Sequence, residues 1–379
     1  MKINLPRVII FQFLFVIPLL LLPGLFFIND TILIGLKLIE VALLTVFILF
    51  TLSFKDIYLF VYILLLYFIN IFSTIVNDRS VDELFTLAVV LFPLGMLVSK
   101  FKFPLSKLKY YIKPVSYFYI SIFIVSSLAV LYFPKEYFAD HFTWFFLEKG
   151  PHGSSYSLLA LYSFILLAYF IGSIGGKIFL FSSILFVFLI IGYDVRTVQL
   201  LLLVCFMYLV LKKLDYTIFY ISIFLLVLLV ISLTGYFYLV LNSEIKNFDY
   251  NNFSNGRLFV WSERIQIFSD YSFTTIFFGG GFGADIIATT QWWWVAKASH
   301  NDFISSAFNG GLASLFLYFL ILFRLSSNHL FLNLPLIAIF ISSMLSTGLL
   351  MRPFPLVLLL FVFMLYRNYH NDNVVVRKY

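Results

Sequence analysis

Long apolar stretches separated by short polar connections make up most of the chain. A stretch of about 20 apolar residues can cross a bilayer as a helix, and charges, Pro and Gly between stretches mark the ends. The pattern predicts about twelve transmembrane helices, over residues 8–28, 32–54, 57–76, 84–99, 115–133, 155–174, 178–193, 197–211, 216–241, 303–323, 333–350 and 354–367. We therefore expect an all-α polytopic membrane protein, with a single integral membrane domain over residues 1–379.

The composition supports this class. Of the 379 residues, 62% are hydrophobic and 11% are charged, whereas about 25% are charged in ordinary soluble domains. The chain has a single cysteine, Cys205, which lies in an apolar run. One cysteine cannot form an internal disulfide or supply a pair of thiols to a metal. Lys2 and Arg7 precede the first apolar stretch without a small-residue cleavage site, so we interpret it as a retained span rather than a signal peptide.

The charges predict the orientation. With the N-terminus inside, most of the 25 Lys and Arg fall in cytoplasmic segments, and most of the 18 Asp and Glu fall outside. The positive-inside rule then places both termini in the cytoplasm. The basic segment from Lys100 to Lys113 is expected to touch anionic membrane lipid rather than nucleic acid. Lys37 and Glu40 are expected to share a helix face in the second span and to form an ion pair there. A structural role for this pair and a functional role are equally compatible with the sequence.

Residues 242–302 form the one long connection between predicted spans. Loops of this length are functional or disordered, and the Trp and aliphatic residues of this extracytoplasmic loop argue that it folds on the membrane surface. Arg257, Trp261 and Arg264 would share one face of a helix capped by residues 254–256. Two guanidinium groups beside an indole suit a pyrophosphate. Solvated arginines on a surface helix are the alternative.

Three further features of this loop carry chemistry. The glycine-rich run at 278–283 allows the backbone to turn sharply or to approach a ligand closely. The three tryptophans at 292–294 could stack on sugar rings or anchor the loop at the membrane interface. His300 lies just before the tenth predicted span, and an imidazole that titrates near neutrality can accept a proton from a hydroxyl.

Taken in order, these motifs resemble the O-antigen polymerase and O-antigen ligase superfamily. They are Asn255-Gly256-Arg257 with Trp261, the run 278–283, Ser299-His300-Asn301-Asp302-Phe303 and Gly310-Gly311-Leu312. The turns at 193–197 and 150–153 are also similar to turns in that family. The likeness covers the long loop and the tenth span. Two positions, Val195 and Ser314, depart from the family pattern.

The resemblance implies an architecture similar to that of the GT-C glycosyltransferases, in a bacterial plasma (inner) membrane, with the active site on the extracytoplasmic side. It implies a catalytic base at His300 and contacts to a donor pyrophosphate at Arg196 and Arg257, with Arg264 beside them. The candidate sugar or acceptor contacts are Trp261, Trp293, Asn301 and Asp302.

The implied reaction moves an undecaprenyl-pyrophosphate-linked oligosaccharide onto another lipid-linked repeat unit, in O-antigen, capsular or exopolysaccharide synthesis, without metal or other cofactor. The expected partners are these lipid-linked oligosaccharides, membrane lipids and a polysaccharide chain-length regulator. A ligase that transfers polysaccharide to lipid A core is the alternative enzyme. A flippase or transporter is disfavoured, because the polar residues gather in one loop. In the loop before the sixth span, four residues could supply ligands or a base: Asp140, His141, Glu148 and His152.

Overall fold

The computed structural model describes residues 57–80, 94, 105–132, 151–193, 197–203, 257–288, 296, 298–326, 330–345, 359–360, 362–363 and 365. The predicted spans 8–28, 32–54 and 216–241 lie outside these residues, as do Lys37, Glu40 and Cys205. The chain divides into two compact units. The first comprises residues 1–52, 99–233 and 357–379, and the second comprises residues 53–98 and 234–356.

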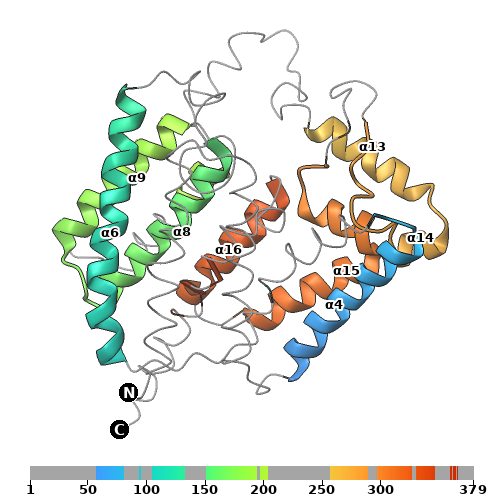
Figure 1. Ribbon diagram of the computed structural model, residues 1–379, viewed down its shortest axis with the longest axis horizontal. Helices are drawn as coiled ribbons and strands as arrows, with labels where there is room; N and C mark the ends of the chain where they lie inside the picture. The colour runs from blue at the N-terminus through green and yellow to red at the C-terminus, as the bar shows by residue number, and fades with distance from the viewer. Residues whose placement is uncertain are drawn as a thin grey trace. The chain divides into compact units, whose positions relative to one another are not determined.

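In the first unit, α6 (Leu105–Tyr132), α8 (Pro151–Phe170) and α9 (Gly176–Tyr193) pack against one another (Figure 1). Aromatic side chains join them: the rings of Tyr162 and Phe186 stack 4.4 Å apart. α8 begins at Pro151, since proline is favoured at the first position of a helix. α6 begins well before the predicted span 115–133, so the described part of the basic segment continues the helix of the span.

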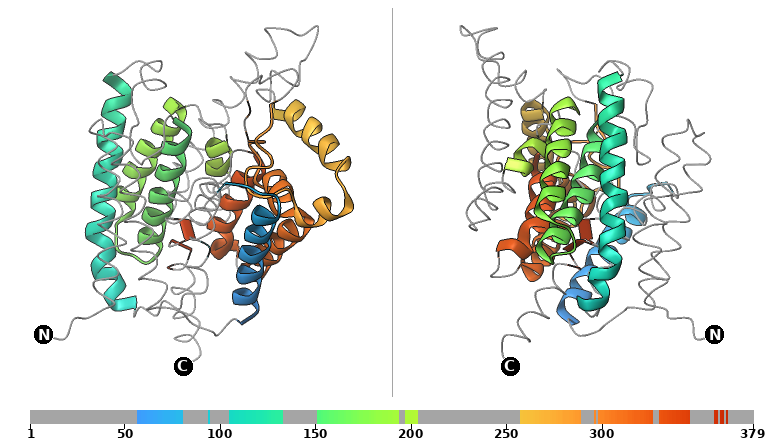
Figure 2. Two further views of the ribbon diagram at one scale, coloured as in Figure 1. Left: turned by 45° about the vertical axis from the view of Figure 1, so that its right-hand side comes forward. Right: turned by 90° about the vertical axis from the view of Figure 1, so that its left-hand side faces the viewer.

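In the second unit, α15 (Asp302–Leu325) packs against four other helices (Figures 1 and 2). These are α4 (Ile57–Val76), α13 (Arg257–Ser269), α14 (Phe273–Phe278) and α16 (Leu330–Leu345). α4 and α15 run in opposite directions. The guanidinium of Arg324, near the end of α15, lies 5.7 Å from the ring of Tyr58 at the start of α4. Nearer the middle of both helices, Asn70 Nδ2 donates to Ser314 Oγ at 3.0 Å.

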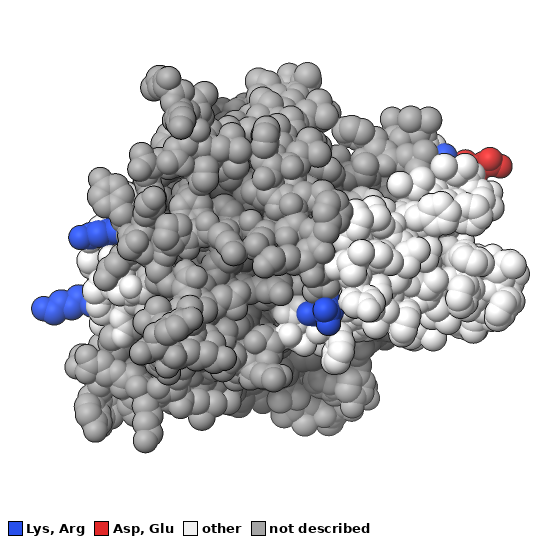
Figure 3. All heavy atoms as spheres, turned by 90° about the horizontal axis from the view of Figure 1, so that it is seen from below, with Lys and Arg blue, Asp and Glu red and all other residues white. Residues whose placement is uncertain are grey.

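Among the described residues, three helices are long and apolar enough to cross a membrane: α4, α9 and α15. α4 has the bounds predicted from the sequence, and the span predicted at 303–323 lies within α15. The described surface in Figure 3 carries few charged side chains. Every regular element of the described residues is a helix. These observations support a helical membrane protein. They also show that the described part of the loop 242–302 is structured, since α13 and α14 pack on α15.

α15 is broken at Gly311, whose φ of 71° and ψ of −173° are not helical. A break in a membrane helix interrupts its i to i−4 hydrogen bonds, and the affected carbonyl groups need other donors. The glycine run supplies them. Gly280 N donates to Phe308 O at 2.7 Å, and Gly281 N donates to Asn309 O at 3.1 Å. The loop is therefore paired to the broken helix through its backbone.

Side chains near the end of α4 complete this junction. Thr74 Oγ1 accepts from Phe282 N at 3.0 Å, and Arg79 Nε donates to Gly280 O at 3.2 Å. Two positions at the junction have space only for glycine: a Cβ at Gly279 would lie 2.5 Å from Asn309 O, and a Cβ at Gly311 would collide with the Phe277 carbonyl. The close approach that the glycine run allows is made here to the backbone of α15. We call residues 74–79, 279–282 and 308–311 the glycine junction.

Replacing Gly311 with Ala should destabilise the protein. The substitution adds a Cβ at positive φ against a backbone carbonyl, and such strain costs about 1–3 kcal/mol before any clash. Thermal unfolding of the detergent-solubilised full chain measures the effect. Gly175→Ala is the matched control, since a Cβ there meets nothing within 4 Å. Equal melting of the two variants would show that the junction does not constrain the fold.

Candidate functional site

His300 adopts a left-handed backbone conformation, with φ of 54°. Such a conformation is uncommon outside glycine and persists where neighbouring contacts hold it. The side chain of His300 is partly exposed, whereas Ser299 and Asn301 on either side are buried. The candidate base therefore stands on a constrained turn between two anchored residues.

Asn301 anchors the turn to the helix that follows. Its Oδ1 accepts hydrogen bonds from Phe303 N at 2.9 Å and Ile304 N at 3.2 Å, which caps the start of α15. Its Nδ2 donates to Met344 O of α16 at 2.9 Å. The predicted acceptor contact at Asn301 is thus a buried capping residue in this structure.

Asp302 is also turned inward. It is 1% exposed, and its Oδ2 accepts from Ser343 Oγ of α16 at 2.8 Å. A carboxylate in the first turn of a helix also interacts favourably with the helix dipole. Asn301 and Asp302 together tie the turn to both α15 and α16.

Asp285 anchors the other side of the turn. It is fully buried, and its Oδ2 accepts from Ser299 N at 3.1 Å, Ser299 Oγ at 3.2 Å and Ser305 Oγ at 2.5 Å. A buried carboxylate is stable only when donors or a nearby cation compensate for lost water. Two of these bonds connect Asp285, three residues beyond the glycine junction, to the residue before His300, and the third reaches Ser305 of α15.

Arg264 contacts the segment that follows Asp285. It is fully buried, and its Nη2 donates to Ile287 O at 2.5 Å. Burial lowers the pKa of its guanidinium, and the negative charges of Asp285 and Glu263 oppose that shift. Arg264 therefore supports the loop from inside the protein. In this structure it has no surface to offer the predicted donor pyrophosphate.

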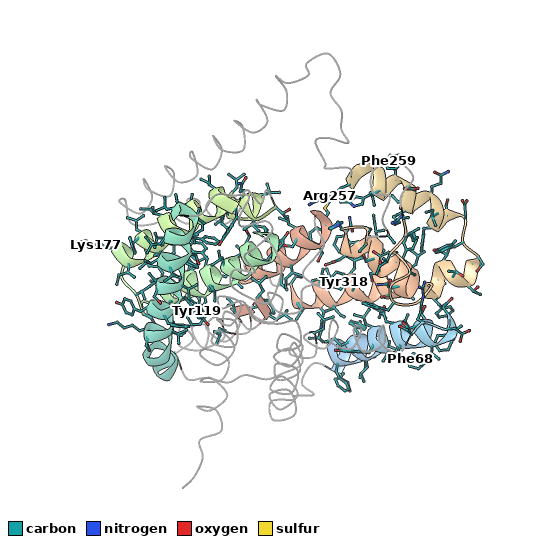
Figure 4. All side chains as sticks on the ribbon, turned by 45° about the horizontal axis from the view of Figure 1, so that its top comes forward. Phe68, Tyr119, Lys177, Arg257, Phe259 and Tyr318 are labelled. Carbon is teal, nitrogen blue, oxygen red and sulfur yellow. The ribbon has the colours of Figure 1, made fainter. Side chains whose placement is uncertain are left out.

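Trp261 joins α13 to residues 299–301, which we call the histidine turn. Its Nε1 donates to Ser299 O at 2.8 Å. Arg257 begins α13 one helical turn earlier, on the same face, and is partly exposed (Figure 4). The face predicted from the sequence does exist, but at Trp261 and Arg264 it is turned toward the protein. The structure thus brings the helix of Arg257 to the residue preceding His300.

Other predicted residues lie outside the described part of the chain. Arg196 and Trp293 are among them, as are Asp140, His141 and Glu148 and the side chain of His152. Among the described residues, no group of three or more His, Cys, Asp or Glu could hold a metal ion. Sequence reasoning missed two charged residues, Asp285 and Arg79, because a lone Asp or Arg carries no motif of its own.

Comparison with protein-family models, with curated proteins and with solved structures finds no match for this chain.

Replacing Asp285 with Ala should destabilise the second unit and loosen the histidine turn. The change leaves three donor groups of Ser299 and Ser305 without this acceptor, at about 1–3 kcal/mol for each group that stays unsatisfied. Thermal unfolding and limited proteolysis of the full chain measure both effects. Asp270→Ala is the control, because Asp270 is exposed in the same unit. Unchanged melting of the Asp285 variant would contradict its structural role.

Proposed function

We propose that this protein is a polysaccharide polymerase of the bacterial plasma membrane, which transfers a polyprenyl-pyrophosphate-linked oligosaccharide onto another lipid-linked repeat unit. The observation that carries the proposal is the bond from Trp261 to Ser299, which holds the helix of Arg257 beside the constrained turn of His300. An imidazole and a guanidinium on two segments that this bond holds together suit the transfer of a sugar from a diphosphate.

In the proposed step, a hydroxyl oxygen of the acceptor sugar attacks the anomeric carbon of the donor. The new glycosidic bond forms as the bond from that carbon to the diphosphate oxygen breaks. The hydroxyl proton passes to the imidazole of His300, and the electron pair leaves with the polyprenyl diphosphate. Arg257 is assigned to neutralise the charge on that leaving group, together with Arg196.

The support around His300 favours a base over a surface histidine without a role. A general base must be held at a fixed distance from the proton it takes, so enzymes position it through a rigid surrounding shell. Here Asp285 and Trp261 hold Ser299 on one side, and Asn301 caps α15 on the other. A left-handed backbone at His300 costs energy, which the surrounding bonds offset.

Replacing His300 with Ala should abolish polymer while the protein stays in the membrane. The acceptor hydroxyl would lose its base, a loss of about 100-fold or more in rate. The measurement is the polysaccharide ladder of a deletion strain of the source organism that carries the variant, with protein level checked by immunoblot. Loss of long chains with one repeat unit still attached to its lipid anchor is the expected pattern.

Two results would overturn this assignment. A full ladder with His300→Ala at normal protein level would show that His300 is not the base. Accumulation of a lipid-linked polymer that is not transferred to its final acceptor would point to a ligase instead. Arg324→Ala is the matched control for Arg257→Ala, since Arg324 lies near the far end of α15. Of these two variants, we expect only Arg257→Ala to lose polymer, because Arg324 is not assigned to the leaving group.

The proposal also requires the histidine turn to face outward. In a Cys205→Ser background, a cysteine introduced by Asp270→Cys should react with a membrane-impermeant maleimide in intact cells, because Asp270 is exposed just after α13. Ser326→Cys, beyond the other end of α15, should react only after permeabilisation. The opposite labelling pattern would place the proposed site in the cytosol, where the extracytoplasmic reaction could not occur.

A further inference from the structure

Five phenylalanines form a continuous series on the surface of the second unit. Their ring centroids follow one another at 6.0 Å from Phe68 to Phe72, 6.3 Å to Phe278, 5.0 Å to Phe277 and 6.4 Å to Phe273. All five are exposed, Phe273 most of all at 80% and Phe68 at 64%. We call them the phenylalanine row. It runs from α4, where Figure 4 labels Phe68, to α14.

The row extends beyond the span onto a short helix with one polar side. In α14, Phe273 and Phe277 are four residues apart and share a face. At the start of α14, Ser272 Oγ lies 2.9 Å from the hydroxyls of both Thr274 and Thr275. Large exposed apolar side chains beside a membrane span are favourable only against apolar matter. α14 packs on α4 and α15, so its phenylalanines continue the exposed apolar surface of α4.

A cation lies where α4 ends. Arg79 follows α4 by three residues, its Nε donates to Gly280 O, and its side chain lies against Gly281. The guanidinium carries four further N–H donors, and the residue is partly exposed. Burial raises the pKa of the Tyr271 hydroxyl, and the positive charges of Arg79 and Arg264 oppose the rise, which places Arg79 near that phenol.

The phenylalanine row and Arg79 together match an amphiphile that has a charged head group and a single hydrocarbon chain. Phe68 lies eight residues before the end of α4, which is about 12 Å along a helix. The apolar row therefore reaches well into the span, while Arg79 stays beyond its end. A single series of rings covers one hydrocarbon chain rather than two, and a guanidinium pairs with phosphate oxygens through paired hydrogen bonds.

We propose that the phenylalanine row and Arg79 bind a polyprenyl diphosphate, with the isoprenoid tail along the row and the diphosphate at Arg79. The inference rests on the proposed function for the identity of the lipid, and it assigns a place to the carrier of one of the two lipid-linked substrates. Arg79 holds the diphosphate at the glycine junction, and the row holds the tail against α4 and α14.

The test uses the purified full chain in phosphatidylcholine nanodiscs and a polyprenyl diphosphate that carries a photoactivatable group on its tail. We expect labelled peptides from α4 and α14, and competition by unlabelled polyprenyl diphosphate but not by phosphatidylglycerol. Arg79→Gln should weaken binding about tenfold or more, as loss of charge-assisted hydrogen bonds predicts. Arg79→Lys should retain part of the affinity, because it keeps the charge.

Matched variants separate the site from general lipid contact. Arg324→Gln removes a cation at the other end of the same helix pair, and Phe323→Ala removes a phenylalanine of α15 that is 78% exposed and lies outside the row. Both should bind as the wild type does. Phe273→Ala should weaken binding several-fold without unfolding, since its side chain is the most exposed of the row.

Three outcomes would overturn the site: equal binding by the Arg79→Gln and Arg324→Gln variants, equal competition by phosphatidylglycerol, or labelling confined to other helices. If Arg79→Gln fails to fold, Phe273→Ala and Arg79→Lys decide in its place. Binding is measured without turnover, so the two proposals fail separately. A normal polysaccharide ladder in the deletion strain itself removes the polymerase assignment and leaves measured binding standing, whereas absent binding removes only the site.

Discussion

The backbone pairing at the break in α15 is the constraint on which the rest of the second unit depends. Inside a membrane protein, a helix that breaks must find other donors for its freed carbonyl groups, because lipid supplies none. Gly280 and Gly281 supply them to Phe308 and Asn309, and Gly279 and Gly311 leave the room for two backbones to meet. The pairing attaches a loop from one part of the sequence to the middle of a span from another.

Two surfaces are built outward from this junction. On one side, Asp285 lies four residues beyond Gly281 and holds the turn of His300 through Ser299 and Ser305. On the other side, Phe278 immediately precedes Gly279 and stands in the row of rings that reaches α4. The proposed chemistry and the proposed lipid contact therefore depend on the same few backbone hydrogen bonds.

The face of α13 predicted from the sequence contains the expected residues, but its exposure to solvent differs from the prediction. Helical periodicity correctly placed Trp261 and Arg264 on one side of α13, where they contact Ser299 and Ile287. The same periodicity does not say whether that side meets water or protein. Arg264 is buried near the carboxylates of Asp285 and Glu263 and supports the loop, whereas Arg257 at the start of the helix keeps exposed surface.

The sequence alone determined the apolar spans that the structure describes, such as α4 and α15, and the structured nature of the described part of the long loop, because hydrophobicity and tryptophan content are properties of consecutive residues. It also singled out His300 and the glycine run by their motifs. Only the tertiary structure decided what these residues touch. Asp285 acts on residues 14 and 20 positions away, and Arg79 binds a carbonyl 201 positions away. Contacts at such separations arise from the packing of helices and leave no periodic trace in the chain.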